Sequence, residues 1–437
     1  MQGRGLTLTA VVLAILAGVL WWSNREKAKE ASKPAPDANP KILSLADSDI
    51  QKIELKKRGG DNTVIQKNGS GKWQMTAPEA YGVDQEAANT LASSATTVNS
   101  DRLVDEKPTD LKQFGLDNPF IEADLTQKNG KTSKLLIGDD APGNSSTYAK
   151  LAGDPKIYTI ASYTKSSFDK TPKDLRDKRL LTFDQDKLTR VELIAKKDDI
   201  EFGRNKDEWQ IVKPKPMRAD GLQVEELVRK VKDAKMDLSV SDEDSKKAAA
   251  NFAVGAPVAT VKVTDNAGTQ ELQLHKKGDD CDAKSSAVVG IQKVPADLCT
   301  GVDKSLADFR NKKLFDFGFN EPSKIEMHAN GKTYSFQKSG EKWTSGGKEM
   351  DNTSVQAFLD KLRDLSAASF VDTGFTTAEI DISVTAKGTE KVLISKSGDK
   401  YVAQRENEPS LYQLDSKTVD DLVHAAGDVK PAPPAKK

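Results

Sequence analysis

Histidine and cysteine are scarce in this sequence, and its two charge signs cancel. The 437 residues include three histidines and two cysteines, and 66 basic residues balance 66 acidic ones. A chain without net positive charge lacks the electrostatic footprint of a general nucleic-acid binder, so we do not expect nucleic acid as a partner. No CxxC or HxxxH spacing is present, and zinc sites usually need four such ligands. We therefore expect neither a metal nor a cofactor.

Signatures of catalysis are also missing. No Gly-x-Ser-x-Gly elbow occurs, and His275, His328 and His424 do not stand beside a plausible nucleophile. Aromatic residues make up 6% of the chain, which disfavours a glycan-binding face built from repeated exposed rings. The sequence therefore indicates a protein that is not an enzyme, with a hydrolase as the least favoured reading.

The N-terminal residues differ from the rest of the chain. Residues 6–22, LTLTAVVLAILAGVLWW, carry no charge, and a span of this length is at the short end for a transmembrane helix. We predict an uncleaved anchor over residues 1–23, with a cleaved signal peptide as the alternative. Residues 24–45, rich in Pro, Ala and Lys, are typical of a linker, and residues 428–437 of a disordered tail.

The two cysteines, Cys281 and Cys299, lie 18 residues apart. N-terminal anchors of this layout usually export the chain that follows, and a lone cysteine pair in an exported body is more often joined than free. We predict a disulfide between them. Two reduced thiols are the alternative.

Three repeats fill the region between linker and tail. DLRDKRLLTF begins at Asp174, and DFRNKKLFDF begins at Asp308. Other positions recur three times, in the same order and at similar spacing: Trp73, Trp209 and Trp343; Asp84, Asp220 and Asp351; Val104, Val240 and Val371. We place the repeats at residues 46–183, 184–317 and 318–427, with the third shortened so that it ends before the basic stretch.

Each repeat opens with short alternating segments, which are typical of half-buried strands joined by hairpins. We predict that each tryptophan fills the core from the third strand, with stacking on a ligand as the alternative. An amphipathic helix follows each aspartate, so we predict Asp84, Asp220 and Asp351 as helix N-caps rather than acid/base or metal carboxylates. Strands then return near Val104, Val240 and Val371. The expected fold class is α+β: three tandem repeat domains, each an antiparallel sheet with one main helix, after the transmembrane helix.

Basic residues cluster at equivalent places near the ends of the first two repeats. They could bind lipid phosphates or an acidic partner, or lie in solvent after complementing a helix C-terminus. These candidate interaction residues are Arg176, Lys178 and Arg179 in the first repeat and Arg310, Lys312 and Lys313 in the second.

The combined pattern resembles a known family. Trp73 to Pro78, Val83-Asp84, Phe114 to Pro119 and Asp174 to Leu180 follow its order of motifs. The chain is similar to DUF4340 domain proteins of bacteria, over residues 46–317 well and over 318–430 in part. The resemblance implies a single N-terminal anchor in the bacterial inner membrane and a body on the periplasmic side. It also implies an accessory role beside an ABC-2-type permease and ATPase, including gliding-motility-like systems, and it carries no catalytic residue.

We therefore expect a non-enzymatic envelope protein that scaffolds or assists an ABC-type transport or gliding-motility-like complex. The alternative is a periplasmic module that binds glycan or another polymer. A deep pocket with converging carboxylates and histidine would instead favour a hydrolase.

Overall fold

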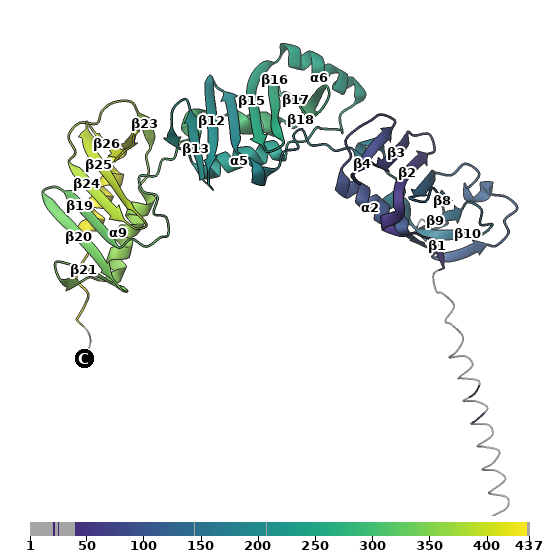
Figure 1. Ribbon diagram of the computed structural model, residues 1–437, viewed down its shortest axis with the longest axis horizontal. Coiled ribbons are helices and arrows are strands. Elements are labelled where there is room, and N and C mark those ends of the chain that lie inside the picture. The colour runs from purple at the N-terminus through teal and green to yellow at the C-terminus, as the bar shows by residue number, and fades with distance from the viewer. Residues whose placement is uncertain (1–20, 22–24, 26–39, 144, 207, 435–437) are drawn as a thin grey trace, which may run out of the picture. The chain divides into compact units, whose positions relative to one another are not determined.

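The computed structural model describes residues 21, 25, 40–143, 145–206 and 208–434 of the chain (Figure 1). The chain divides into two compact units, Met1–Lys178 and Arg179–Lys437. Neighbouring strands are antiparallel in all the sheets of the described residues. The predicted transmembrane helix falls almost wholly outside the described residues.

The first unit contains one large sheet and a small ribbon. The ribbon pairs β1 (Lys41–Ser44) with β5 (Thr97–Asn99). The large sheet has eight strands in the order β4 (Trp73–Ala77), β3 (Asn62–Lys67), β2 (Ile50–Lys57), β7 (Ile121–Gln127), β8 (Thr132–Asp140), β9 (Ser146–Leu151), β10 (Ile157–Ala161) and β6 (Arg102–Asp105). Its helices are η1 (Asp47–Asp49), α2 (Gln85–Thr96), η2 (Lys112–Phe114), α3 (Ser162–Phe168) and α4 (Pro172–Leu175).

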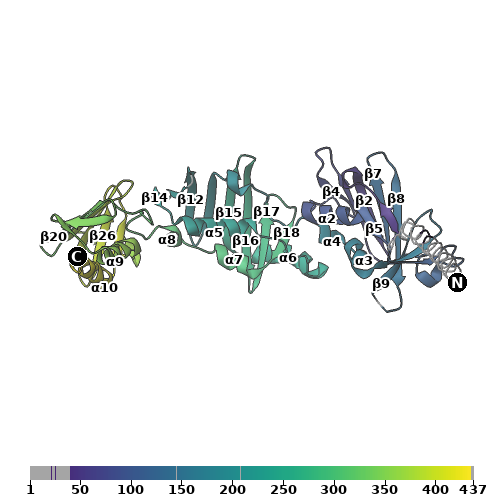
Figure 2. The same cartoon turned by 90° about the horizontal axis from the view of Figure 1, so that it is seen from below.

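The second unit contains two large sheets. The first of them, here the second sheet, has the order β14 (Met217–Arg218), β13 (Glu208–Lys213), β12 (Asp198–Asn205), β11 (Arg190–Ala195), β15 (Ala256–Asp265), β16 (Gly268–Lys277), β17 (Asp280–Ser285) and β18 (Ile291–Val294). Its helices are η3 (Gln185–Lys187), α5 (Gly221–Lys232), α6 (Asp242–Val254), α7 (Ala296–Val302) and α8 (Leu306–Phe309). Figure 2 shows α5 and α7 near each other on this sheet and α6 at its β18 end.

The third sheet has nine strands. Their order is β22 (Lys348–Glu349), β21 (Lys342–Ser345), β20 (Lys332–Ser339), β19 (Lys324–Ala329), β24 (Ile380–Thr385), β25 (Thr389–Ser397), β26 (Lys400–Arg405), β27 (Leu411–Leu414) and β23 (Ser369–Val371). Two helices accompany it and pack against each other, α9 (Asn352–Asp364) and α10 (Ser416–Gly427).

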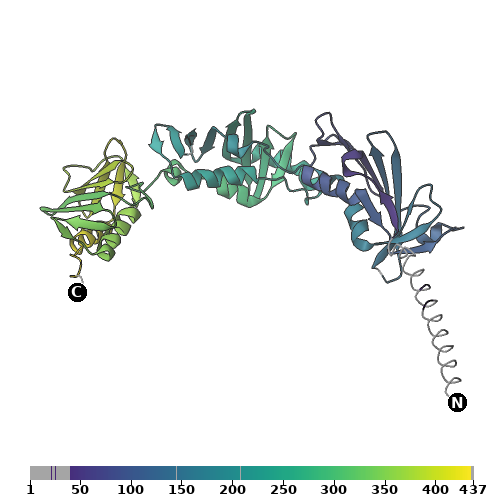
Figure 3. The same ribbon diagram turned by 60° about the horizontal axis from the view of Figure 1, so that its bottom comes forward.

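Alternation along the strands builds each core on the face that carries the main helix. In β11, Val191, Leu193 and Ala195 are buried while the residues between them are more exposed. Each fully buried Val, Leu or Ile stabilises the fold by about 1.5–3 kcal/mol. The three tryptophans occupy these cores at exposures of 2% for Trp73, 6% for Trp209 and 3% for Trp343. Figure 3 shows α5 along one face of the second sheet.

The three repeated aspartates lie at the N-caps of α2, α5 and α9. Asp84 accepts hydrogen bonds from the backbone N–H groups of the first turn of α2, and Asp220 does the same for α5. Asp351 accepts from the Ser354 N–H at 2.8 Å. An oxygen in this position satisfies N–H groups that have no partner within the helix, and it typically stabilises a helix by about 1 kcal/mol.

The basic stretch pairs with the residue that precedes each capping aspartate. Val83 forms an isolated β-bridge with Arg176, and Ala219 forms one with Arg310. The Asp220 N–H donates to the Phe309 carbonyl at 2.7 Å. In the second unit, the same stretch continues to the next repeat, where the Leu314 N–H donates to the Leu365 carbonyl at 3.0 Å. The second copy of this stretch is therefore a joint, bonded to the second repeat at its start and to the third repeat at its end.

The predicted fold class is wrong for the described residues. Strands clearly predominate over helices, and each large sheet is accompanied by more than one helix. No helix among the described residues is long and apolar enough to cross a membrane. In the first two repeats the single-helix prediction failed because α6 has a weak apolar period and α3, α4, α7 and α8 are too short to show one. In the third it passed over α10, whose apolar face is as clear as that of α9.

Three local predictions also need correction. Residues 41–44, placed in the linker, form β1 because Ile42 and Leu43 are buried there. The strand expected at Val240 is absent, since the chain turns into α6. Part of the predicted tail is bonded to the third repeat: Met350 bridges to Pro431, and the Asp351 N–H donates to the Lys430 carbonyl at 2.9 Å.

Candidate functional site

Charged side chains gather where the second and third sheets meet. Arg218, on the edge strand β14, donates from Nη1 to both carboxylate oxygens of Asp316, at 2.8 and 2.7 Å. Its Nη2 donates to the Lys313 carbonyl at 2.5 Å and to the Tyr412 hydroxyl at 3.0 Å. Charge-assisted hydrogen bonds of this kind are shorter and stronger than those between neutral groups. Arg218 thus ties β14 to both the joint and β27.

A second arginine completes this group, which we call the joint network: Arg218, Asp316, Glu390, Arg405, Glu408 and Tyr412. Arg405 lies at the end of β26, with Nη1 3.0 Å from Asp316 Oδ2 and Nη2 3.2 Å from Glu390 Oε2. Its Nε lies 2.9 Å from Glu408 Oε1, and the Nε of Arg218 lies at the same distance from that oxygen. Two guanidinium groups therefore share two of the three carboxylates.

Burial and charge act against each other in the joint network. Burial disfavours the charged form of Arg218, but the carboxylate of Asp316, with Tyr412 and Glu408, outweighs it and raises the pKa of Arg218. Tyr412 is 1% exposed, and burial raises the pKa of its hydroxyl. That hydroxyl accepts from Arg218 and donates to Glu408 at 2.9 Å. Arg218 Nε lies near Glu408 without making a hydrogen bond, whereas the other contacts named here are used within the fold, which suits a structural link rather than a reaction centre.

The predicted basic residues make different kinds of contact within the fold. The Arg310 guanidinium carbon lies 3.4 Å from the centre of the Phe370 ring, and its Nη2 donates to Ser410 Oγ at 3.0 Å. Burial lowers the pKa of Arg310. Lys312 contributes its carbonyl, which accepts from the Ala367 N–H at 2.8 Å. The structure therefore places the second basic group around the joint.

In the first unit, the Arg176 guanidinium carbon lies 4.1 Å from the centre of the Tyr81 ring. Burial would raise the pKa of Asp174, but hydrogen bonds from Thr171 and, more weakly, the charges of Lys170 and Lys178 lower it. In the second unit, Arg179 forms a β-bridge with Lys235. Whether these residues also bind an acidic partner stays a prediction.

Sequence reasoning missed most of the joint network, because its residues do not recur. Arg218 stands two residues before Asp220, where the first repeat has Gly82 before Asp84. Arg218 and Tyr412 are 194 residues apart in the chain. A repeat comparison selects shared positions, so it passes over residues that appear once. The only available signal was the lone arginine before a capping aspartate.

Cys281 on β17 and Cys299 on α7 form a disulfide, with a Cα–Cα distance of 6.1 Å. Both are 1% exposed and belong to the core of the second sheet. The bond fastens α7 to the face of the sheet that also carries α5. It occurs in the second repeat alone among the described residues.

Removing this disulfide with Cys281→Ala/Cys299→Ala should destabilise the second sheet by about 3 kcal/mol, because an 18-residue loop is no longer closed in the unfolded chain. Hydrogen exchange of the β17 and α7 amides measures the loss. Reducing the wild-type protein should reproduce it. Equal protection in all three samples would show that packing alone holds α7.

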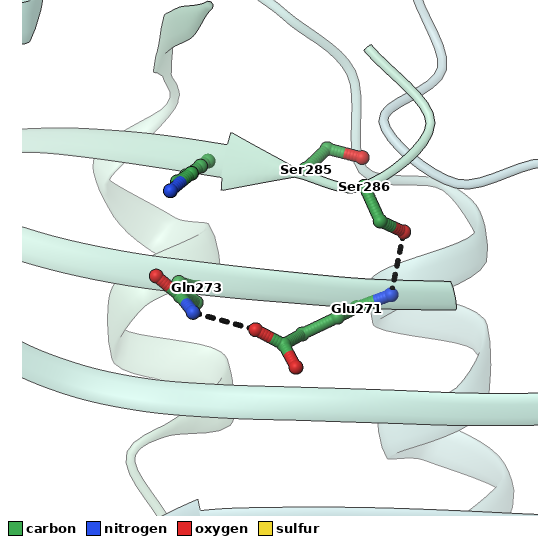
Figure 4. A pocket seen from close by; sticks show the side chains of 5 residues that line it. Glu271, Gln273, Ser285 and Ser286 are labelled. Atoms are coloured by element: carbon green, nitrogen blue, oxygen red, sulfur yellow. Dashed lines mark hydrogen bonds between the residues drawn. The ribbon is translucent and has the colours of Figure 1, made fainter. Parts of the chain in front are cut away.

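A shallow cavity lies on the other face of the same sheet (Figure 4). Its volume is about 240 Å³, and it is lined by Glu271, Gln273, Lys284, Ser285 and Ser286. Gln273 Nε2 donates to Glu271 Oε1 at 2.5 Å, and Ser286 Oγ accepts from the Glu271 N–H at 2.8 Å. Ligand pockets are usually larger, at about 300–1,000 Å³, and mostly apolar. Glu271, Gln273 and Ser286 bond to one another, and Ser285 bonds to the Leu180 carbonyl. No aromatic ring lines the cavity to stack a sugar.

No group of three or more His, Cys, Asp or Glu side chains among the described residues is placed to hold a metal ion. The repeated aspartates are bonded as helix caps and the repeated tryptophans are buried, so neither set forms an open site.

The sequence matches the family model described as a domain of unknown function (DUF4340) twice, over residues 73–210 and 209–381. The chain belongs to the DUF4340 family. Each DUF4340 match begins at or beside one of the repeated tryptophans, Trp73 or Trp209, and so starts on the third strand of a sheet rather than at its first. The two matches are consistent with tandem copies of the domain. No curated protein and no solved structure matched the chain.

Proposed function

We propose that this DUF4340 protein is a non-enzymatic scaffold on the periplasmic side of the bacterial inner membrane, where it assists an ABC-type transport or gliding-motility-like complex. The observation that carries the proposal is the joint network. It fastens two sheets through partly buried ion pairs and hydrogen bonds, and its arginines are engaged within the fold. A scaffold needs surfaces held at a set spacing, whereas a catalytic centre needs polar groups left free for a substrate.

Two further observations support the proposal. The disulfide suits a compartment outside the cytoplasm, where such bonds persist. Large apolar side chains are exposed on separate elements: Tyr163 at 77%, Leu222 at 82% and Phe319 at 94%. Single exposed apolar residues are common on monomers, but these three give defined positions at which to look for a partner.

Site-specific photocrosslinking in native membranes tests this function. A photoreactive amino acid replaces Tyr163, Leu222 or Phe319 in the full-length chain, and Lys417, which is exposed and lies on α10, serves as the polar control. We expect at least one apolar position to crosslink to a permease, with the ATPase recovered in the same purification in mild detergent. Recovery of the chain alone from every position would contradict the transport role.

A further inference from the structure

One position on the equivalent strands β8, β16 and β25 differs among the three repeats. In the first and third repeats it is Gly138 and Ser395, and in the second it is His275, each following a buried Ile or Leu in register. A Cβ at Gly138 would lie 2.2 Å from the Phe114 carbonyl oxygen, so the backbone at Phe114 passes directly against β8 at this position. In the second repeat this close approach is replaced by a stack: the His275 and Phe252 ring centres are 3.9 Å apart with planes 9° apart. His275 Nδ1 also lies 2.7 Å from the Phe252 carbonyl.

A buried carboxylate lies across from this histidine. Asp282 on β17 is the register partner of His275 on β16 and of Lys293 on β18. Because Cys281 faces the core and its disulfide, the next residue faces the opposite side of the sheet. Asp282 is 1% exposed, and its Oδ1 makes no hydrogen bond among the described residues. The third repeat has Val402 as the register partner of Ser395. The second repeat thus carries two ionisable side chains at a place where the third has a serine and a valine.

Helix α6 covers this side of the sheet, since it packs on β16, β17 and β18. In the first and third repeats the chain instead adds the edge strands β6 and β23. The first and second repeats share one backbone hydrogen bond at this edge: the Asp101 N–H donates to the Thr159 carbonyl, and the Asp237 N–H donates to the Lys293 carbonyl. After it, the first repeat continues into β6 and the second into α6. Helix α6 therefore stands at the sheet edge where the first and third repeats have an edge strand.

Few apolar side chains of α6 are buried against the sheet. Of its described side chains, Ala248 is buried, whereas Val254 at its end is 70% exposed. Among its described side chains, Phe252 contacts His275, and Asn251 Oδ1 accepts from Lys277 Nζ at 3.1 Å. A helix with so little apolar contact belongs to the low-stability end of a fold.

We propose that α6 is a lid that stays closed over Asp282 while its carboxyl group is protonated and lifts when that group ionises, which exposes the outer face of β16, β17 and β18. An ionised carboxylate without a hydrogen-bond partner is costly to keep buried, and a neutral one is much less so. The lifted helix would uncover a continuous polar face, because Glu271, Gln273 and His275 alternate along β16 from the cavity to the lid.

The neighbouring charges set the direction of the response. Burial raises the pKa of Asp282, the charge of Lys293 lowers it, and that of Asp280 raises it again. Lys293 is itself paired with Asp280 and lies near enough to Asp244 of α6 for that charge to raise its pKa. His275 faces Asp282 from β16, and Lys284 lies on the same face of β17. A raised pKa in the closed form favours closure at low pH, and this preference is lost as the pH rises through that value, above the ordinary 3.8.

Hydrogen exchange of the full-length protein tests the lid. Protection of the α6 amides, corrected for intrinsic exchange, is measured from about pH 4 to about pH 8. In the wild type we expect protection to fall as the pH rises, because the closed form holds the Asp282 proton more tightly than the open form does. Asp282→Asn should remove this dependence, and Asp279→Asn, which removes an exposed charge in the turn before β17, should retain it.

Two results would overturn the proposal: a wild-type profile that is flat with pH, or an Asp282→Asn profile that still follows the wild type. Protection of β11 and β12 reports whether each variant is folded. Should Asp282→Asn fail to fold, Phe252→Ala gives a second test. It should lower α6 protection at low pH, where the wild type is closed, and α6 protection equal to that of the wild type there would also count against a lid held by the Phe252 contact.

Discussion

Replacing Arg218 with alanine should loosen the joint between the second and third sheets by about 3 kcal/mol. Removing one partner of a buried ion pair leaves the others uncompensated, and such changes commonly cost about 3–5 kcal/mol. Arg218 is 19% exposed and contacts both Asp316 and Glu408, so Arg405 alone would remain to neutralise three carboxylates. We use the lower end of the range because Asp316 is 40% exposed and solvent screens it in part.

The effect should be local. The amides of Leu314 and Ala367 donate across the joint, to Leu365 and Lys312. Their exchange should speed up by about a hundredfold, the equivalent of about 3 kcal/mol, while amides in β11 and β15 keep wild-type rates. Arg229→Ala removes an exposed arginine from α5 and serves as the matched control. Unchanged protection at Leu314 and Ala367 would mean that the backbone bonds alone hold the joint, and the scaffold proposal would lose its main support.

Trp343→Ala should destabilise the third sheet by about 3–5 kcal/mol. The ring is 3% exposed within the core that also contains Phe358 and Leu362. Replacing a buried tryptophan by alanine removes its transfer free energy and leaves a cavity that the surroundings fill only in part. Chemical denaturation followed by exchange of the β19 and β24 amides measures the loss.

Trp343→Phe provides the matched comparison, because it keeps an aromatic ring and should cost clearly less. A loss near zero for Trp343→Ala would show that the ring does not support the core. It would then return the tryptophans to consideration as ligand-stacking residues, the alternative that their spacing in the sequence left open.

The features that recur were the ones that could be predicted from the sequence. A tryptophan on the third strand and an aspartate before an amphipathic helix each have a local physical cause, burial and capping, so their positions follow from spacing alone. The disulfide between Cys281 and Cys299 followed from there being one pair in a chain expected to be exported.

The features that occur once could not be predicted in this way. The joint network depends on side chains such as Arg218 and Glu408, which lie far apart in the chain and meet only after the sheets have formed. Helix α6 replaces an expected strand at Val240, and its sequence lacks the strong apolar period that would announce a helix. The burial of Asp282 could not be predicted either, because α6 packs over its strand and α6 itself was not expected.

The backbone contacts of residues 430–431 have a consequence for how the repeats are joined to one another. Lys430 and Pro431 occupy, beside Met350 and Asp351, the place that Phe309 and Arg310 occupy beside Ala219 and Asp220. The residues beside each capping aspartate therefore pair either with a segment that leads into the next sheet or with residues 430–431, which follow α10. Because the two segments make the same backbone contacts, replacing residues 430–431 with a stretch like that of residues 309–310 should leave the third sheet unchanged and allow a further repeat to be joined there.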